Sequence, residues 1–85
     1  MKILIADDEA PARTRLAALL AADNGEHEIV GQAANGREVL ALCDRQAVDL
    51  VLLDIRMPCM DGIQTALALA ARLRPPAVVF TTAYD

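Results

Sequence analysis

The chain has 85 residues, which allows one small domain with a core near the lower limit for independent folding. Hydrophobic residues make up 55% of the chain and aromatic residues only 2%, so we expect an aliphatic core. The formal net charge of -4 argues against a nucleic-acid-binding surface within this segment.

The first predicted strand is the apolar run from Lys2 to Ala6, which ends in the acids Asp7, Asp8 and Glu9. This run is too short, and too quickly followed by charge, to be a signal peptide. No other apolar run approaches the length of a membrane span. We therefore expect a cytoplasmic protein with no membrane partner.

A helix and a weaker strand follow. The helix opens with Glu9-Ala10-Pro11, because proline is favoured in a first turn, and is expected to run to about Ala22. Its buried face is predicted to carry Leu16, Leu19 and Leu20. Residues 28–34 predict a second strand, whose glycine and glutamine favour an edge position.

The next two elements are a helix from Arg37 to about Gln46 and a strongly apolar strand. The buried side of the helix is expected to carry Val39, Leu40 and Cys43. The strand, residues 50–53, is a run of consecutive apolar residues. A strand with one wet face would alternate, so this one is predicted to be central in a parallel sheet. Asp54 stands at its carboxyl end.

A third helix and a fourth strand complete the pattern. The helix follows Gly62 and is expected to end at Pro75-Pro76, since neither proline can continue a helix. Its predicted apolar stripe is Ile63, Ala66, Leu67, Ala70 and Leu73. Residues 77–81 form the fourth strand, followed by Thr82. The alternation of strands and helices, with right-handed crossovers, predicts a parallel α/β sheet.

Acids follow two of these strands, at the edge where open α/β sheets bind ligands. If the strands are neighbours, Asp7, Asp8 and Asp54 converge, because adjacent strands lie about 5 Å apart. Each close pair of carboxylates would repel by roughly 4 kcal/mol at an effective dielectric of about 20. A hard divalent cation is the simplest way to offset that repulsion.

Three motifs stand out: a strand ending in Asp-Asp, a strand V-L-L-D whose aspartate begins the pattern D-x-x-M-P-x-M-D-G, and a fourth strand ending in T-A. Together they resemble the receiver domain of bacterial response regulators. The segment D-D-E-A-P-A-R is further similar to receivers joined to LytTR-type DNA-binding domains. The resemblance spans the whole chain. It implies a flavodoxin-like (CheY-like) doubly wound parallel sheet with strand order 2-1-3-4.

The resemblance also implies a phosphotransfer site. Asp54 would be the phosphoacceptor, forming an aspartyl phosphate with a phosphoryl group from a sensor histidine kinase. Mg²⁺ would be bound by Asp8, Asp54 and the backbone carbonyl of Arg56, while Asp7 would act mainly through metal-bound water. The domain would be a switch that controls an output such as transcription, and not an enzyme acting on an external substrate.

Other positions of the resemblance shape the switch. Thr82 would supply the hydroxyl that moves to the phosphoryl oxygens. Met57 and Pro58 would shape the loop after the acceptor, and Gly62 would allow the turn beyond it. Both cysteines, Cys43 and Cys59, are expected to be free thiols, since no second pair suggests a metal site.

The sequence departs from the receiver pattern in one respect. Receivers have a fifth strand that ends in a lysine, with a helix on each side of that strand, and this sequence ends before all of them. Its only lysine, Lys2, lies roughly 16 Å from the acids along the first strand. We therefore expect residues 1–85 to be the N-terminal portion of a receiver, with no second domain. DNA would be contacted only through an output domain absent here, and the uncovered strand at 77–81 would promote self-association or strand exchange.

Two other functions stay open. The chain could be a receiver-like interaction module that does not accept phosphate. It could also be an aspartyl-phosphate hydrolase of the haloacid dehalogenase type, since Asp7 and Glu9 have D-x-D-like spacing, although the acceptor-like Asp54 on another strand disfavours this. Among the remaining polar residues, Asp61 is expected to cap the third helix and His27 to be a surface residue.

Overall fold

The computed structural model describes residues 1–23 and 25–81, which form one parallel sheet of four strands in the order β2-β1-β3-β4. The strands are β1 (Lys2–Ala6), β2 (Glu28–Ala33), β3 (Leu50–Asp54) and β4 (Ala77–Thr81). They alternate with the helices α1 (Ala10–Ala21), α2 (Gly36–Arg45) and α3 (Gly62–Ala70). The predicted α/β architecture and the strand order 2-1-3-4 are confirmed, and so is the edge position of β2.

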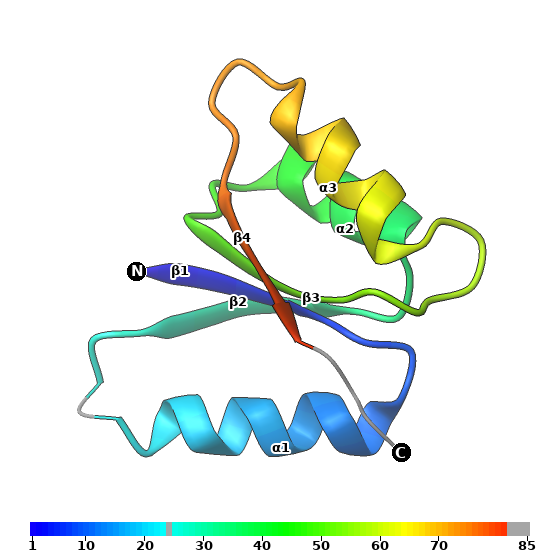
Figure 1. The fold of residues 1–85 in the computed structure, drawn as a ribbon. Coiled ribbons are helices and arrows are strands. Elements are labelled where there is room, and N and C mark those ends of the chain that lie inside the picture. Colours follow the sequence, from blue (N-terminus) through cyan, green and yellow to red (C-terminus); the bar gives the residue numbers. More distant parts are fainter. Residues whose placement is uncertain (24, 82–85) are drawn as a thin grey trace.

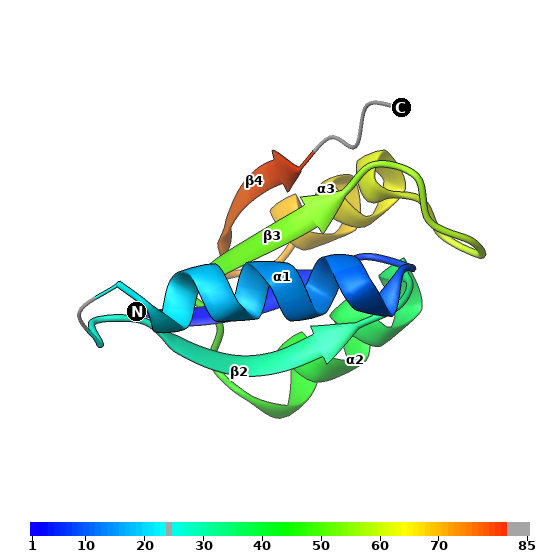
Figure 2. The same ribbon diagram turned by 90° about the horizontal axis from the view of Figure 1, so that it is seen from below.

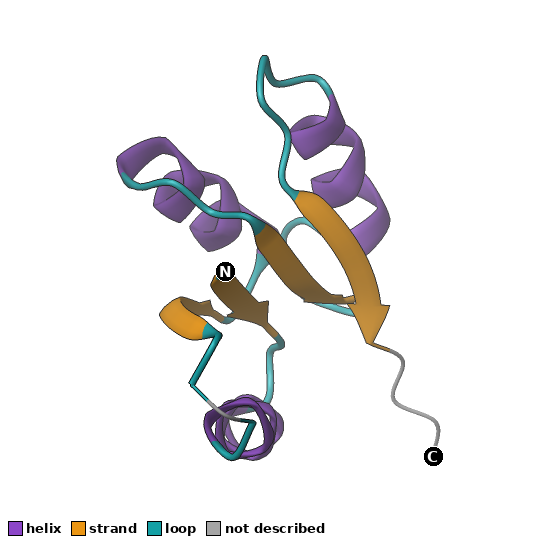
Figure 3. Ribbon diagram, turned by 90° about the vertical axis from the view of Figure 1, so that its left-hand side faces the viewer, coloured by secondary structure: helices purple, strands orange, loops and turns teal. Residues whose placement is uncertain are grey.

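The helices cover the two faces of the sheet unequally. Helix α1 packs on one face, and α2 and α3 pack together on the other (Figures 1 and 3). Seen from the α1 side, α1 lies over β1, and β4 is left without a helix in front of it among the described elements (Figure 2). Val79 and Phe80 of β4 are 51% and 40% exposed. The described sheet therefore has one buried centre and one apolar, poorly covered edge.

The main core lies between the sheet and the pair α2 and α3. Strands β1 and β3 contribute residues that are fully buried, which matches their continuous apolar sequence, because a central parallel strand is covered on both faces. The cluster consists of Leu4, Ala6, Ala33, Val39, Val51, Leu53, Met57 and Leu69. None of the described helices is long and apolar enough to cross a membrane.

Helix α3 differs from its prediction in both length and orientation. It ends at Ala70, well before the prolines, and Leu73 is fully exposed. Leu67 of the expected apolar stripe is 68% exposed, and the buried positions are instead Gly62, Thr65 and Leu69. The prediction followed one set of apolar positions that fits the helical period. Gly62 faces inward because the start of α3 lies against the backbone at the end of β3, and Thr65 faces Gly36 of α2.

Helix α1 has the expected boundaries but a different inner face. Leu16 and Leu20 are half-buried, as predicted, whereas Leu19 is 64% exposed. No residue of α1 is fully buried. Among the described elements, α1 packs mainly against β1 and β2, so its contact face is narrow. The prediction that Leu19 is buried was wrong.

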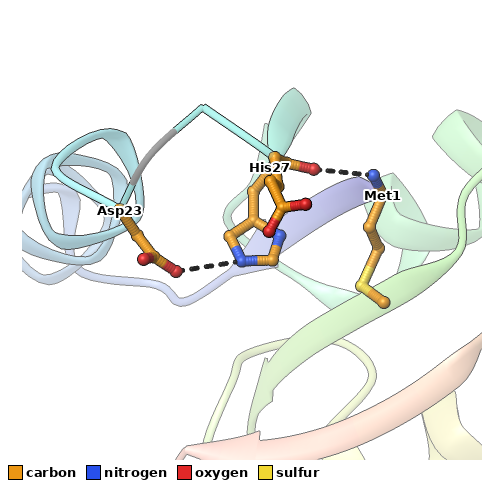
Figure 4. Close-up of polar contacts among 4 residues, drawn as sticks. Met1, Asp23 and His27 are labelled. Atoms are coloured by element: carbon orange, nitrogen blue, oxygen red, sulfur yellow. Dashed lines mark hydrogen bonds and ion pairs between the residues drawn. The ribbon is translucent and has the colours of Figure 1, made fainter.

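The loop between α1 and β2 is fastened at the amino end of the sheet (Figure 4). Nε2 of His27 lies 3.2 Å from a carboxylate oxygen of Asp23, and the amino group of Met1 donates to the carbonyl oxygen of Glu26 at 2.9 Å. His27 was expected to be a surface residue, but it is half-buried. These contacts lie at the start of β1, roughly 16 Å by strand rise from the acids that follow its end.

Candidate functional site

Two buried carboxylates stand side by side at the carboxyl edge of the sheet. The register of β1 and β3 pairs Ala6 with Leu53, so Asp7 and Asp54 follow the last paired residues of neighbouring strands. Asp7 is 6% exposed and Asp54 is 7% exposed. The fold therefore brings together acids that are 47 positions apart in the sequence, at the edge where the strand pattern placed them.

Asp54 has few groups that stabilise its charge. Its Oδ1 accepts a long hydrogen bond of 3.4 Å from the backbone N–H of Arg56. Burial raises the pKa of the Asp54 carboxyl, and the negative charges of Asp7 and Asp8 raise it further, against the lowering effect of the Arg56 and Ile55 backbone. A buried carboxylate beside two others attracts a cation, because a positive charge offsets their mutual repulsion. With such a cation present, a phosphoryl group can also be held there.

The loop after β1 gathers three acids. One carboxylate oxygen from each of Asp7, Asp8 and Glu9 lies within 4.8 Å of the other two. Asp7 is buried, and Asp8 and Glu9 are exposed. Asp54 is not one of these three mutually close ligands, although its charge interacts with those of Asp7 and Asp8. Carboxylate oxygens of this kind suit Mg²⁺, which keeps several waters and takes one or two carboxylates.

Arg13 holds the backbone of this loop, a function that the sequence analysis missed. Its Nη1 donates to the carbonyl oxygen of Asp7 at 2.7 Å, and its Nε donates to Gln32 on β2 at 3.3 Å. The Asp7 carboxylate also accepts from the N–H of Glu9 at 2.9 Å. The only sequence signal for Arg13 was its place in the segment D-D-E-A-P-A-R. Asp7 is therefore fixed through both its backbone and its side chain.

The loop after β3 is anchored at both of its ends. Met57 is 8% exposed and belongs to the core cluster, while Pro58 and Cys59 are exposed. At the other end, the N–H of Gly62 donates to the carbonyl oxygen of Ile55 at 2.8 Å. A Cβ atom at Gly62 would lie 2.7 Å from the Cα of Ile55 and closer still to the carbonyl oxygen of Asp54. This contact holds the start of α3 against the end of β3.

The amino end of α3 is capped as predicted. The Asp61 side chain accepts from the N–H of Gln64 at 2.8 Å, and the Gln64 side chain accepts from the N–H of Asp61 at 3.1 Å. Asp61 therefore has a helix-capping function. The hydroxyl of the buried Thr65 donates to the carbonyl oxygen of Asp61 at 2.7 Å, which fixes the first turn.

Some candidate residues are placed differently or not described. Arg56 is exposed and directs its N–H toward Asp54. Thr82 and Tyr84 lie outside the described residues, and the last described residue, Thr81, is paired in register with Asp54.

A cavity of about 560 Å³ lies at the opposite end of the sheet from the acids, near Cys43, Asp49, Arg72 and Pro75. Burial raises the pKa of the Cys43 thiol, which keeps it protonated beside the core.

Known proteins resemble the chain over its whole length. The sequence matches the response regulator receiver domain over residues 3–85. It is 51% identical over 85 residues to the positive alginate biosynthesis regulatory protein of Pseudomonas aeruginosa, covering 100% of this chain and 34% of that protein. It is 41% identical over 80 residues to the transcriptional regulatory protein PdtaR of Mycobacterium tuberculosis, covering 94% of this chain and 38% of the other. The chain thus spans about a third of the length of these relatives.

Solved structures agree with this match. The response regulatory domain of protein mrkE from Klebsiella pneumoniae superposes with a TM-score of 0.89 at 34% identity, covering 100% of this chain and 69% of that one. The CheX-CheY-BeF3-Mg complex from Borrelia burgdorferi gives a TM-score of 0.89 at 27% identity, covering 99% of this chain and 63% of the other. The predicted CheY-like fold is therefore correct. Sequence and fold together show that this chain belongs to the family of response regulator receiver domains.

Proposed function

We propose that this chain is the phosphoacceptor domain of a two-component response regulator and that Asp54 is the residue phosphorylated. The convergence of Asp54 with Asp7 and Asp8 at the carboxyl edge of β1 and β3 carries this proposal. The phosphoryl donor would be the phosphohistidine of a sensor histidine kinase. Membership of the receiver family supports that partner.

The residues present suit Mg²⁺ as the cofactor, because the donor set near Asp54 is made of oxygen atoms from acids. The carboxylates of Asp8 and Asp54 and the backbone carbonyl of Arg56 would bind the ion, and Asp7 would act through metal-bound water. When bound, the ion would neutralise the charge of the transferred phosphoryl group. The related CheX-CheY complex from Borrelia burgdorferi contains BeF3 and Mg²⁺, which supports this assignment.

In the proposed step, a carboxylate oxygen of Asp54 attacks phosphorus in line with the leaving group. The new P–O bond forms as the P–N bond to the histidine breaks, and the released imidazole nitrogen takes a proton from solvent. Little covalent assistance is needed, because phosphoryl transfer depends on positioning and charge stabilisation. The anchored loops at Asp7 and Gly62 supply the positioning.

The product would act as a switch and not as an enzyme. Phosphorylation adds nearly two negative charges at a site already crowded with acids, so neighbouring loops must rearrange to accommodate them. Thr82 would donate its hydroxyl to a phosphoryl oxygen, and the loop shaped by Met57 and Pro58 would respond.

We further propose that the output is transcription, through a LytTR-type or other DNA-binding domain outside these residues. The regulatory names of the two relatives support this. Coverage of 69% of a solved receiver supports assigning residues 1–85 to the N-terminal portion of the domain. A second copy of the chain would be a further partner, recruited by the exposed β4 edge.

The direct test is phosphorylation of the full-length protein by phosphoramidate with Mg²⁺, followed by intact-mass measurement. One phosphoryl group should be added to the wild type and none to Asp54→Asn. Asp8→Ala should weaken the dependence on Mg²⁺. Failure of the wild type to gain the group would overturn the proposal, and turnover of a phosphate monoester that survives Asp54→Asn would favour the hydrolase instead.

A further inference from the structure

Arg13 lies next to the acids that follow β1 and forms an ion pair with none of them. Helix α1 begins at the end of the sheet where β1 ends (Figure 1), and Arg13 belongs to the first part of this helix. Among residues 1–23 and 25–81, no ion pair includes Arg13. Its guanidinium group donates instead to a backbone carbonyl and to a neutral amide. The carboxylate oxygens of the acids are therefore not occupied by this cation.

The first contact of Arg13 is made at the peptide group that joins two of the acids. Its Nη1 donates to the carbonyl oxygen of Asp7 at 2.7 Å. That carbonyl belongs to the planar peptide unit between Asp7 and Asp8, so holding its oxygen limits how the two residues can turn. Hydrogen bonds from a charged donor are stronger than neutral ones. A single contact therefore orients the backbone of both acids.

The second contact connects Arg13 to the neighbouring strand. Its Nε donates to Oε1 of Gln32 at 3.3 Å, and the N–H of Asp7 donates to the carbonyl oxygen of Ala33 at 3.0 Å. Gln32 and Ala33 are the last two residues of β2. A guanidinium group presents its donors in a rigid planar fork, which a flexible ammonium group does not. Arg13 therefore holds Asp7 against the end of β2.

The charge of Arg13 and its contacts have opposite effects on a cation bound by the acids. A nearby positive charge repels Mg²⁺, so the removal of that charge would by itself strengthen Mg²⁺ binding. The contacts act in the other direction, because groups that orient metal ligands commonly raise metal affinity by roughly 10–100-fold. The two effects differ in sign, so a measurement of Mg²⁺ affinity separates them.

We propose that Arg13 is a positioning residue that holds Asp7 and Asp8 in the arrangement that binds Mg²⁺. The inference rests on the proposed function, because it requires Mg²⁺ at these acids. Arg13 acts through the backbone of Asp7 and contacts neither the ion nor the phosphoryl group. Its loss should weaken Mg²⁺ binding even though a positive charge is removed, and phosphorylation should then require more Mg²⁺ to reach the same rate.

The test measures the dissociation constant of Mg²⁺ for the full-length protein by titration calorimetry. Arg13→Gln should bind Mg²⁺ about tenfold more weakly than the wild type. Arg13→Lys keeps the charge and loses the fork, so it should also bind more weakly. Arg15→Gln is the matched control, because it removes the same charge from an exposed position of α1. This control should bind Mg²⁺ at least as tightly as the wild type.

The melting temperature without Mg²⁺ completes the test. A purely structural function of Arg13 would lower the melting temperature of Arg13→Gln and leave its Mg²⁺ affinity unchanged, and a purely electrostatic function would raise that affinity. Either result overturns the inference and leaves the phosphoacceptor proposal standing.

A variant at the second contact keeps the inference testable if Arg13→Gln does not fold. Gln32→Ala removes one partner of Arg13 at an exposed side chain and should also weaken Mg²⁺ binding. Unchanged Mg²⁺ affinity in both Gln32→Ala and Arg13→Lys would overturn the inference. If the wild type binds no Mg²⁺ and gains no phosphoryl group, the proposed function itself fails.

Discussion

The absence of a side chain at Gly62 sets the distance between α3 and the strand that carries Asp54. A Cβ atom at this position would lie 2.7 Å from the Cα of Ile55, which is backbone and cannot rotate away. We expect Gly62→Ala to destabilise the fold by about 2 kcal/mol, as overpacking does, and to slow phosphorylation of Asp54. Urea denaturation and the phosphoramidate assay would measure the two effects.

The matched control is Gly25→Ala, in the loop after α1. Gly25 has a φ of 72°, but a Cβ atom there would meet no atom within 4 Å, so its substitution introduces strain without a clash. It should cost about 1 kcal/mol and leave phosphorylation unchanged. Equal losses of phosphorylation in the two variants would show that close contact with β3 is not what makes Gly62 necessary.

The raised pKa of Asp54 predicts a stability that falls as pH rises. Burial and the charges of Asp7 and Asp8 favour the protonated acid in the folded state, so the folded chain binds more protons than the unfolded chain. Stability is therefore lost as pH rises from the unfolded value of 3.8 through the raised folded pKa. Asp54→Asn should be more stable than the wild type at pH 7, and the difference should vanish near pH 3.

Urea denaturation at several pH values checks this prediction, with Glu26→Gln as a control because Glu26 is exposed and far from the acids. Added Mg²⁺ should narrow the difference at neutral pH by stabilising the wild type. If the wild type is more stable than Asp54→Asn at pH 7 without metal, the charge of Asp54 is already stabilised by a partner in the resting protein, and the prediction is wrong.

At the level of whole elements, the sequence determined the order of helices and strands better than their faces. The strands could be predicted because continuous apolar runs bounded by charge have few other interpretations. The acids at the ends of β1 and β3 could be placed for the same reason, since topology brings carboxyl ends together. The contacts that Arg13 makes with Asp7 and Gln32 could not be found, because they depend on the rotamer of a long side chain and not on composition.

Helix α3 shows where the periodicity argument failed. Its apolar residues fit more than one stripe, and the pattern does not reveal that Gly62 must face the backbone of Asp54. Once that contact is made, Leu69 turns inward and Leu67 turns outward, with exposed fractions of 0% and 68%. The stripe containing Ile63, Leu67 and Leu73 was predicted from the helical period, whereas the orientation of α3 follows from the close approach of its backbone to that of β3.

The orientation of α3 can be tested with two leucines of the same helix. Leu69→Ala should destabilise the domain by about 3 kcal/mol, because it opens a cavity among fully buried neighbours. Leu67→Ala should change stability by less than about 0.5 kcal/mol, since the side chain is exposed. Urea midpoints for both variants provide the measurement, and a larger loss for Leu67→Ala would restore the orientation predicted from periodicity.

At the scale of the whole molecule, the two ends of the sheet differ in chemistry. The carboxyl end holds the acids and the anchored loops, while the amino end holds the Asp23–His27 contact and the cavity near Cys43. Between them, the only described helix on the α1 face packs mainly against β1 and β2. On the other face, Val51 and Leu53 of β3 and Val78 of β4 pack in the core cluster with residues of α2 and α3. Within residues 1–23 and 25–81, the sheet is therefore covered at its centre and open at the β4 edge.

That open edge predicts self-association of the 85-residue chain. A strand edge with unpaired backbone groups and exposed apolar side chains recruits another chain, and Val79 is 51% exposed on β4. Sedimentation velocity over a range of concentrations should show dimers or larger species. Val79→Lys should shift the chain toward monomer, because a charge at an edge opposes strand pairing.

Leu67→Lys is the matched control for Val79→Lys, because Leu67 is a similarly apolar and exposed residue on α3. This control should leave association unchanged. A chain that is monomeric at every concentration, or one that associates equally well with Val79→Lys, would show that the β4 edge does not recruit a second copy.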